Sequence, residues 1–162
     1  MVELKTHSKR RYIIFGLLFG LIFFLLLKFI CCPIIIRDVS LPYNFGIACR
    51  MYKSINNGDI IGFKKYFSDK YIPDDIVLIK KVACISGDNL TVIGKKYYCN
   101  NKLISVAKDM DKKGNKVDNF KFNGIISEGK LFVIGTNRDS YDSKYFGFID
   151  KDKTIYKVYP LL

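Results

Sequence analysis

The chain opens with one long apolar segment and continues with short apolar runs separated by polar turns. Residues 13–36 read IIFGLLFGLIFFLLLKFICCPIII, and only Lys28 and Pro33 interrupt the run. Roughly 20 apolar residues let a helix cross a bilayer. A cleaved signal peptide would have a shorter apolar run and a small-residue cleavage site, and FICCPIIIRD offers neither. The pattern therefore predicts a retained transmembrane anchor over residues 13–36.

Basic residues flank this anchor unequally. Residues 1–12 are rich in Lys and Arg, whereas only Arg37 follows closely after the apolar run. Cytoplasmic flanks of membrane helices carry the excess of basic residues. We therefore expect a single pass through the cytoplasmic membrane, with residues 1–12 inside and residues 37–162 on the periplasmic or outer face.

After residue 36 the apolar residues come in short, strand-like runs, and no ten-residue stretch shows helical periodicity. The expected strands cover residues 59–63, 76–85, 89–93, 97–99, 102–104, 130–134 and 154–159. The dipeptide Asn100-Asn101 predicts a two-residue hairpin turn, and the polar stretch 106–124 predicts a loop or loose hairpin. The predicted fold class is all-β: one mainly antiparallel β domain over residues 37–162.

Charge and cysteine content narrow the function classes. The chain has 27 Lys or Arg and 15 Asp or Glu, for a net charge of +12. The basic residues are spread along the chain, which argues against nucleic-acid binding and fits attraction to anionic lipids. The only histidine, His7, precedes the anchor, so we expect no metal site and no cofactor. Without a CxxC motif, the pairing among Cys49, Cys84 and Cys99 stays open.

The lysine pair in the longest expected strand is the first candidate for chemistry. Successive side chains of a strand point to opposite faces. One of Lys80 and Lys81 therefore lies on the apolar face formed by Leu78 and Val82. A buried ammonium is unfavourable, so such a lysine favours the neutral amine, which is a general base for a serine hydroxyl. The alternative is that both lysines are exposed at a strand edge.

A serine nucleophile in this domain would need a lysine as its base, because no histidine follows the anchor. Ser40, in Val39-Ser40-Leu41-Pro42, comes directly after the apolar run. By itself this serine could equally begin a turn. Residues 135–147, GTNRDSYDSKYFG, are unusually polar between two apolar runs, and composition alone is typical of a surface turn.

Together these segments resemble the conserved sequence motifs, or boxes, of the signal peptidase I superfamily. Members of this superfamily are membrane-tethered Ser/Lys proteases. NGDIIGF (57–63) is similar to the family pattern G-D-(I/V)-(V/I)-x-F, and LIKKVACISGD (78–88) to (Y/L)-I-K-R-V-x-x-x-P-G-D. The segment 135–147 resembles G-D-N-R-x-x-S-x-D-S-R-Y-(W/F)-G, the most distinctive of the boxes. Their order and spacing agree as well, from Ser40 to Ile149.

The resemblance implies a role for each matching residue. Ser40 matches the nucleophile and Lys80 the general base. Ser140 falls on the serine that positions the lysine ammonium. Asp142 and Lys144 fall on the Asp-x-Arg pair that braces the site, with Lys in place of Arg. Lysine cannot copy the bidentate fork of arginine, so we expect a looser brace.

The nucleophile segment favours one branch of the superfamily. Proline lies two residues after Ser40, and Gly46-Ile47 follows, which is similar to the conjugative-transfer (TraF-type) box S-x-P-x-G-(I/L)-Y-R rather than to Ser-Met-x-Pro. This chain has two extra residues before the glycine and Ala-Cys where Tyr is usual. Asp38 stands where some members have a serine donor, so the backbone N–H of Ser40 would carry most of the oxyanion stabilisation.

The resemblance thus implies a membrane-anchored serine endopeptidase that cleaves exported preproteins. In the TraF-type case the substrates would be pilin or mating-pore proteins, with a secretion or mating-pore apparatus as partner. Three alternatives stay open: a general signal peptidase I, a non-catalytic β domain of a secretion apparatus, and a self-cleaving domain of the repressor kind. The last would need a DNA-binding module where this chain has an apolar helix. Whether products are hydrolysed or cyclised is also open.

Overall fold

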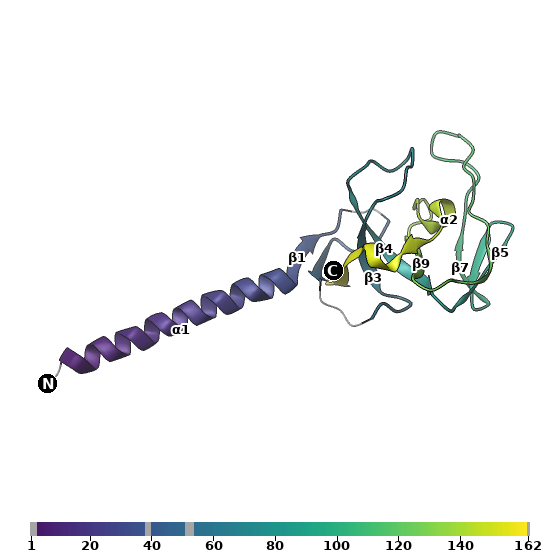
Figure 1. The fold of residues 1–162 in the computed structure, drawn as a ribbon. Coiled ribbons are helices and arrows are strands. Elements are labelled where there is room, and N and C mark those ends of the chain that lie inside the picture. The colour runs from purple at the N-terminus through teal and green to yellow at the C-terminus, as the bar shows by residue number, and fades with distance from the viewer. Residues whose placement is uncertain (1–2, 38–39, 51–53, 162) are drawn as a thin grey trace. The chain divides into compact units, whose positions relative to one another are not determined.

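The structure, a computed structural model, describes residues 3–37, 40–50 and 54–161. It divides into two compact units, Met1–Cys32 and Pro33–Leu162. The first unit consists of helix α1 (Glu3–Ile30), drawn in purple in Figure 1. Its stretch Lys9–Leu27, with a mean hydropathy of 2.0, is long and apolar enough to cross a membrane.

The helix ends earlier than the apolar run does. The predicted anchor, residues 13–36, is divided between α1, which ends at Ile30, and strand β1 (Cys31–Ile35). Pro33 explains the break, because proline lacks an N–H donor and disfavours helical geometry in the residue before it. In the sheet order β1 lies at one end, where proline is tolerated.

The second unit contains two antiparallel sheets, so the predicted all-β class is confirmed. The seven-stranded sheet has the order β1, β2 (Phe45–Cys49), β11 (Thr154–Pro160), β3 (Ile60–Lys64), β4 (Val77–Ile85), β9 (Lys130–Ile134) and β10 (Ile149–Asp150). The four-stranded sheet has the order β7 (Lys102–Val106), β6 (Lys96–Cys99), β5 (Asn89–Ile93) and β8 (Asn123–Ile125). Helix α2 (Ser143–Phe146) and the short 3₁₀ helix η1 (Lys151–Lys153) complete the described elements.

Local turn chemistry accounts for the hairpin between β6 and β7. Asn100 and Asn101 have φ of 48° and 66°, the left-handed pair that a two-residue hairpin turn needs. The predicted turn is thus confirmed. Strand β2 was not predicted, because its five residues include Gly46 and show no clean alternation. A Cβ at Gly46 would lie 2.9 Å from Val158 Cγ1, so the glycine lets β11 approach closely.

The stretch predicted as a loop is only partly loose. Between β7 and β8 the described residues form one isolated bridge, Met110 with Lys116. Near the end of the stretch, Phe120 and Phe122 pack against Phe148, with ring centroids 5.2 and 4.9 Å apart. These rings cover a buried apolar cluster and fix the loop to the domain core.

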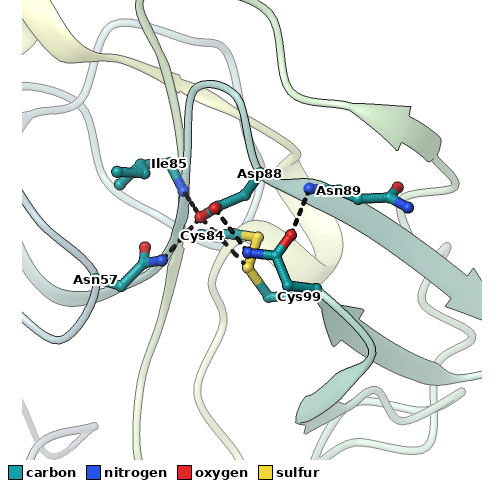
Figure 2. Close-up of a disulfide and its surroundings, with 7 residues drawn as sticks. Asn57, Cys84, Ile85, Asp88, Asn89 and Cys99 are labelled. Atoms are coloured by element: carbon teal, nitrogen blue, oxygen red, sulfur yellow. Dashed lines mark hydrogen bonds between the residues drawn. A yellow bond between two sulfur atoms is a disulfide. The ribbon is translucent and has the colours of Figure 1, made fainter.

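A disulfide joins the two sheets. Cys84 on β4 is bonded to Cys99 on β6, with Cα atoms 5.8 Å apart (Figure 2). Beside it, Asp88 accepts hydrogen bonds from the Ile85 N–H and from the side-chain amides of Asn57 and Asn100. Burial raises the pKa of Asp88, but these hydrogen bonds outweigh it and hold the pKa below its usual value. One of the open cysteine pairings is thereby resolved.

Candidate active site

Ser40 and Lys80 lie side by side although they are 40 residues apart in the chain. Lys80 Nζ is 2.6 Å from Ser40 Oγ. Both residues are almost completely buried, with exposed fractions of 4% for Ser40 and 3% for Lys80, whereas Lys81 is partly exposed. Alternation along β4 thus selects Lys80 as the buried member of the pair, as the sequence predicts.

The segment after β9 holds the backbone of Ser40. The Ser40 carbonyl accepts hydrogen bonds from the N–H groups of Thr136 and Asn137, at 2.7 and 3.1 Å. The Thr136 hydroxyl donates a third, at 3.0 Å. These contacts were not predicted, because sequence composition does not indicate which backbone groups a polar segment will bind.

Gly135 occupies the space between two serines. A Cβ at this position would lie 2.2 Å from Ser140 Oγ and 2.7 Å from Ser40 Cβ. Such distances do not occur between non-bonded atoms, so only glycine fits here. The Gly135 N–H donates to Asp142 Oδ2 at 2.9 Å, which links this contact point to the acidic residue of the same segment.

Ser140 is buried beside the pair, but the structure lacks the hydrogen bond that the resemblance implies. Among the described residues, Ser140 Oγ has no hydrogen-bond partner. Its side chain packs against Gly135 instead of donating to or accepting from Lys80. A buried hydroxyl without a partner is unfavourable, and a change of rotamer would be needed for it to reach another polar group.

Asp142 and Lys144 form a buried ion pair. Lys144 Nζ is 2.7 Å from Asp142 Oδ2, and their side chains are 1% and 0% exposed. The Lys144 N–H also donates to Asp142 Oδ1, so Asp142 caps the N-terminus of α2. Next to it, Ser143 Oγ accepts from the Val133 N–H of β9. The pair therefore fixes residues 142–144 against the end of β9.

The four-stranded sheet contacts the backbone of Lys144. The Tyr97 hydroxyl on β6 lies 2.8 Å from the Lys144 carbonyl oxygen, and the Phe120 N–H donates to the same oxygen. Burial raises the pKa of Tyr97, and the charges of Tyr145 and Asp142 raise it further. Tyr97 therefore remains a neutral hydroxyl donor.

Replacing Lys144 with methionine should destabilise the domain strongly. The change leaves the Asp142 carboxylate buried without its cation, which costs about 3–5 kcal/mol of unfolding free energy. Chemical unfolding of the full chain in detergent micelles measures this loss. The double variant Asp142→Asn/Lys144→Met removes both charges and should recover part of the stability. Equal stability of Lys144→Met and the native chain would contradict a structural role for the pair.

An apolar cluster adjoins the Ser40–Lys80 pair. Leu41 follows Ser40, Ile79 precedes Lys80, and both are buried with Ile36 and with Ile60 of β3. Asp38, which was predicted to weaken oxyanion stabilisation, lies outside the described residues.

The arrangement has the parts that acyl transfer by a Ser/Lys pair requires. A hydroxyl lies within hydrogen-bond reach of an amine. The backbone of that serine is held by three hydrogen bonds from Thr136 and Asn137, and a buried ion pair braces the segment that supplies all three.

Comparison with known proteins shows the family. The family described as "Signal peptidase, peptidase S26" matches residues 9–160, and the chain belongs to this family. Signal peptidase I V of Bacillus subtilis (strain 168) is 30% identical in an alignment of 115 residues that covers 64% of this chain and 64% of the relative. The chain thus matches less than two thirds of that relative's length.

A solved structure is also similar. The crystal structure of a signal peptidase I from Enterococcus faecalis V583 matches 69% of this chain and 100% of its own, with 23% identity and a TM-score of 0.43. The family assignment rests on the sequence match, and the fold description rests on the strands of this chain.

Proposed function

We propose that the chain is a membrane-anchored serine endopeptidase that cleaves exported preproteins. Ser40 is the nucleophile and Lys80 is the general base. The observation that carries this proposal is the 2.6 Å contact between Lys80 Nζ and Ser40 Oγ, both buried, in a member of the signal peptidase family. A non-catalytic β domain of a secretion apparatus would not require this buried contact.

The proposed reaction has two stages. The neutral amine of Lys80 accepts the Ser40 hydroxyl proton while Oγ attacks the peptide carbonyl carbon. The proton then passes to the departing amine as the C–N bond breaks, which leaves an acyl-enzyme ester on Ser40. In the second stage Lys80 removes a proton from water and the hydroxide attacks the ester carbonyl carbon. The bond from that carbon to Oγ then breaks, the carboxylic acid product leaves, and Lys80 returns the proton to Oγ.

Three further residues support this chemistry in the proposal. Ser140 positions the Lys80 amine once substrate is bound, because catalytic hydrogen bonds often form or tighten only in the complex. Asp142 and Lys144 brace Gly135 and so keep Ser40 in place. The Ser40 N–H stabilises the oxyanion, a contribution typically worth about 2.7–4 kcal/mol for one donor.

The proposed location follows from helix α1. Its stretch Lys9–Leu27 is long and apolar enough to span a bilayer. Lys5 precedes this stretch, and Lys9, Arg10 and Arg11 lie at its start. The proposal places the helix in the cytoplasmic membrane with its N-terminus inside and the β domain on the outer face. The Cys84–Cys99 disulfide supports an oxidising compartment for that domain.

Two substrate classes fit the site. The narrower one, pilin or conjugative-transfer proteins processed by a TraF-type enzyme, rests on the spacing of Ser40, Pro42 and Gly46. The broader one, signal peptides of many secreted proteins, is favoured by the similarity to signal peptidase I V of Bacillus subtilis. Both use the same Ser40–Lys80 chemistry.

The test is cleavage of purified preproteins and prepilins by the full chain in detergent micelles. Mass spectrometry of the products should find one cut between the signal segment and the mature segment. Ser40→Ala, purified in the same way, controls for a contaminating peptidase and should give no product. Absence of cleavage by the native chain, or equal cleavage by Ser40→Ala, would overturn the proposal.

A further inference from the structure

A cavity begins beside the candidate active site. It has a volume of about 500 Å³ and is lined by Lys81, by residues 104–106 of β7 and by residues 134–138 after β9. Three of these lining residues, Gly135, Thr136 and Asn137, contact Ser40. A peptide that passes Ser40 could therefore continue into this cavity, which we term the basic groove.

One wall of the basic groove is a strand edge. Residues 104–106 are consecutive on β7, and consecutive strand residues point to opposite faces. Their joint contribution means that the edge of β7 lines the groove. In the four-stranded sheet β7 is the terminal strand, with β6 as its neighbour, and Figure 1 draws it beside β9. A terminal strand offers backbone groups that an extended peptide can pair with.

Two cations line the groove, Lys81 and Arg138. Among the residues that the structure describes, no carboxylate lies within ion-pair distance of either of them. The carboxylate next to Arg138, Asp139, forms its ion pair with Lys108. The hydrogen bond and charge of Lys108 hold the pKa of Asp139 below its usual value, and the charge of Arg138 lowers it further. Cations in a groove attract and orient negative charge.

The sheet order indicates which part of a substrate would enter. Strands β3 and β9 flank β4 on opposite sides. The apolar cluster around Leu41 and Ile79 extends to β3, whereas the basic groove begins at the end of β9. A peptide that crosses Ser40 from the side of β3 therefore directs the segment after the scissile bond toward the groove.

We propose that the basic groove binds the segment following the scissile bond and selects acidic side chains there, through Lys81 and Arg138. This inference rests on the proposed function. Exposed ion pairs contribute modestly and are screened by salt. The selection should therefore be a preference in kcat/KM of about three- to tenfold for two added acidic residues, and it should shrink at high salt.

The experiment compares two peptides that are identical up to the scissile bond. After it, one carries Asp or Glu at two of the second to fifth positions, and the other carries Asn or Gln at the same two positions. The full chain should cleave the acidic peptide with the higher kcat/KM. In Lys81→Gln/Arg138→Gln the ratio of the two kcat/KM values should fall to about one. Lys102→Gln, at an exposed lysine on β7 outside the groove, should keep the ratio.

The outcomes separate the inference from the proposed function. Cleavage of both peptides at equal rates would overturn the groove while leaving the peptidase intact. A preference that persists in Lys81→Gln/Arg138→Gln would also overturn it, because the selecting charges would lie elsewhere. No cleavage of either peptide would remove the proposed function, and the inference with it.

Discussion

Replacing Lys80 with methionine is expected to lower kcat/KM by about a thousandfold or more, with little change in stability. Methionine is close to lysine in length and fills the space between Leu78 and Val82, but it cannot accept the proton of Ser40. General acid–base catalysis contributes about 10²–10⁴-fold, and the lysine would serve in both stages. The measurement is kcat/KM for a cleaved preprotein at several enzyme concentrations.

The matched control for this variant is another buried lysine. Lys65 is 6% exposed and donates to the Ile72 carbonyl and to Asp74, so it has no part in the dyad. Lys65→Met should lower stability yet leave kcat/KM within about threefold, since this lysine is remote from the chemistry. A similar loss of activity in both variants would mean that buried lysines act through folding alone, and the role of Lys80 as base would be wrong.

The sequence predicts a buried lysine because strand geometry is local and regular. Alternation along one strand is enough to bury one of two adjacent lysines, and a domain without histidine leaves lysine as the base for a serine. The pairing of Lys80 with Ser40, 40 residues away, comes only from the resemblance to the family boxes. The pairing of Asp142 with Lys144 comes from the same resemblance.

The contacts of Gly135 and Thr136 with Ser40 depend on distances in the folded chain, which the spacing of residues in the sequence does not indicate. Gly135 and Thr136 belong to the polar segment 135–147. Their contribution to the site comes from close approach to Ser40 and from backbone hydrogen bonds, which polar composition does not predict. Similarly, an apolar run is compatible with a membrane helix and with a buried strand. The division at Ile30 is therefore visible only when β1 is seen paired in the sheet.

Gly135→Ala should lower kcat/KM by about a hundredfold or more. The added methyl group would have to occupy space 2.2 Å from Ser140 Oγ, 2.5 Å from Ser140 Cβ and 2.7 Å from Ser40 Cβ, so one or both serines must move. A displacement of about 1 Å in reacting groups can cost about 100-fold in rate. Overpacking should also lower the unfolding free energy by about 1–3 kcal/mol.

A substitution at a second glycine, Gly129, serves as the control that distinguishes a loss of stability from a displacement of Ser40. Gly129 has φ of +75°, and a Cβ there would meet no atom within 4 Å. Gly129→Ala therefore adds backbone strain of about 1–2 kcal/mol without touching Ser40, and it should keep near-native kcat/KM. Adding Ser140→Gly to Gly135→Ala removes the two closest clashes, so stability should recover. Native activity in Gly135→Ala would show that Ser40 tolerates displacement, and the tight packing of residues 135–140 would then serve the fold rather than the reaction.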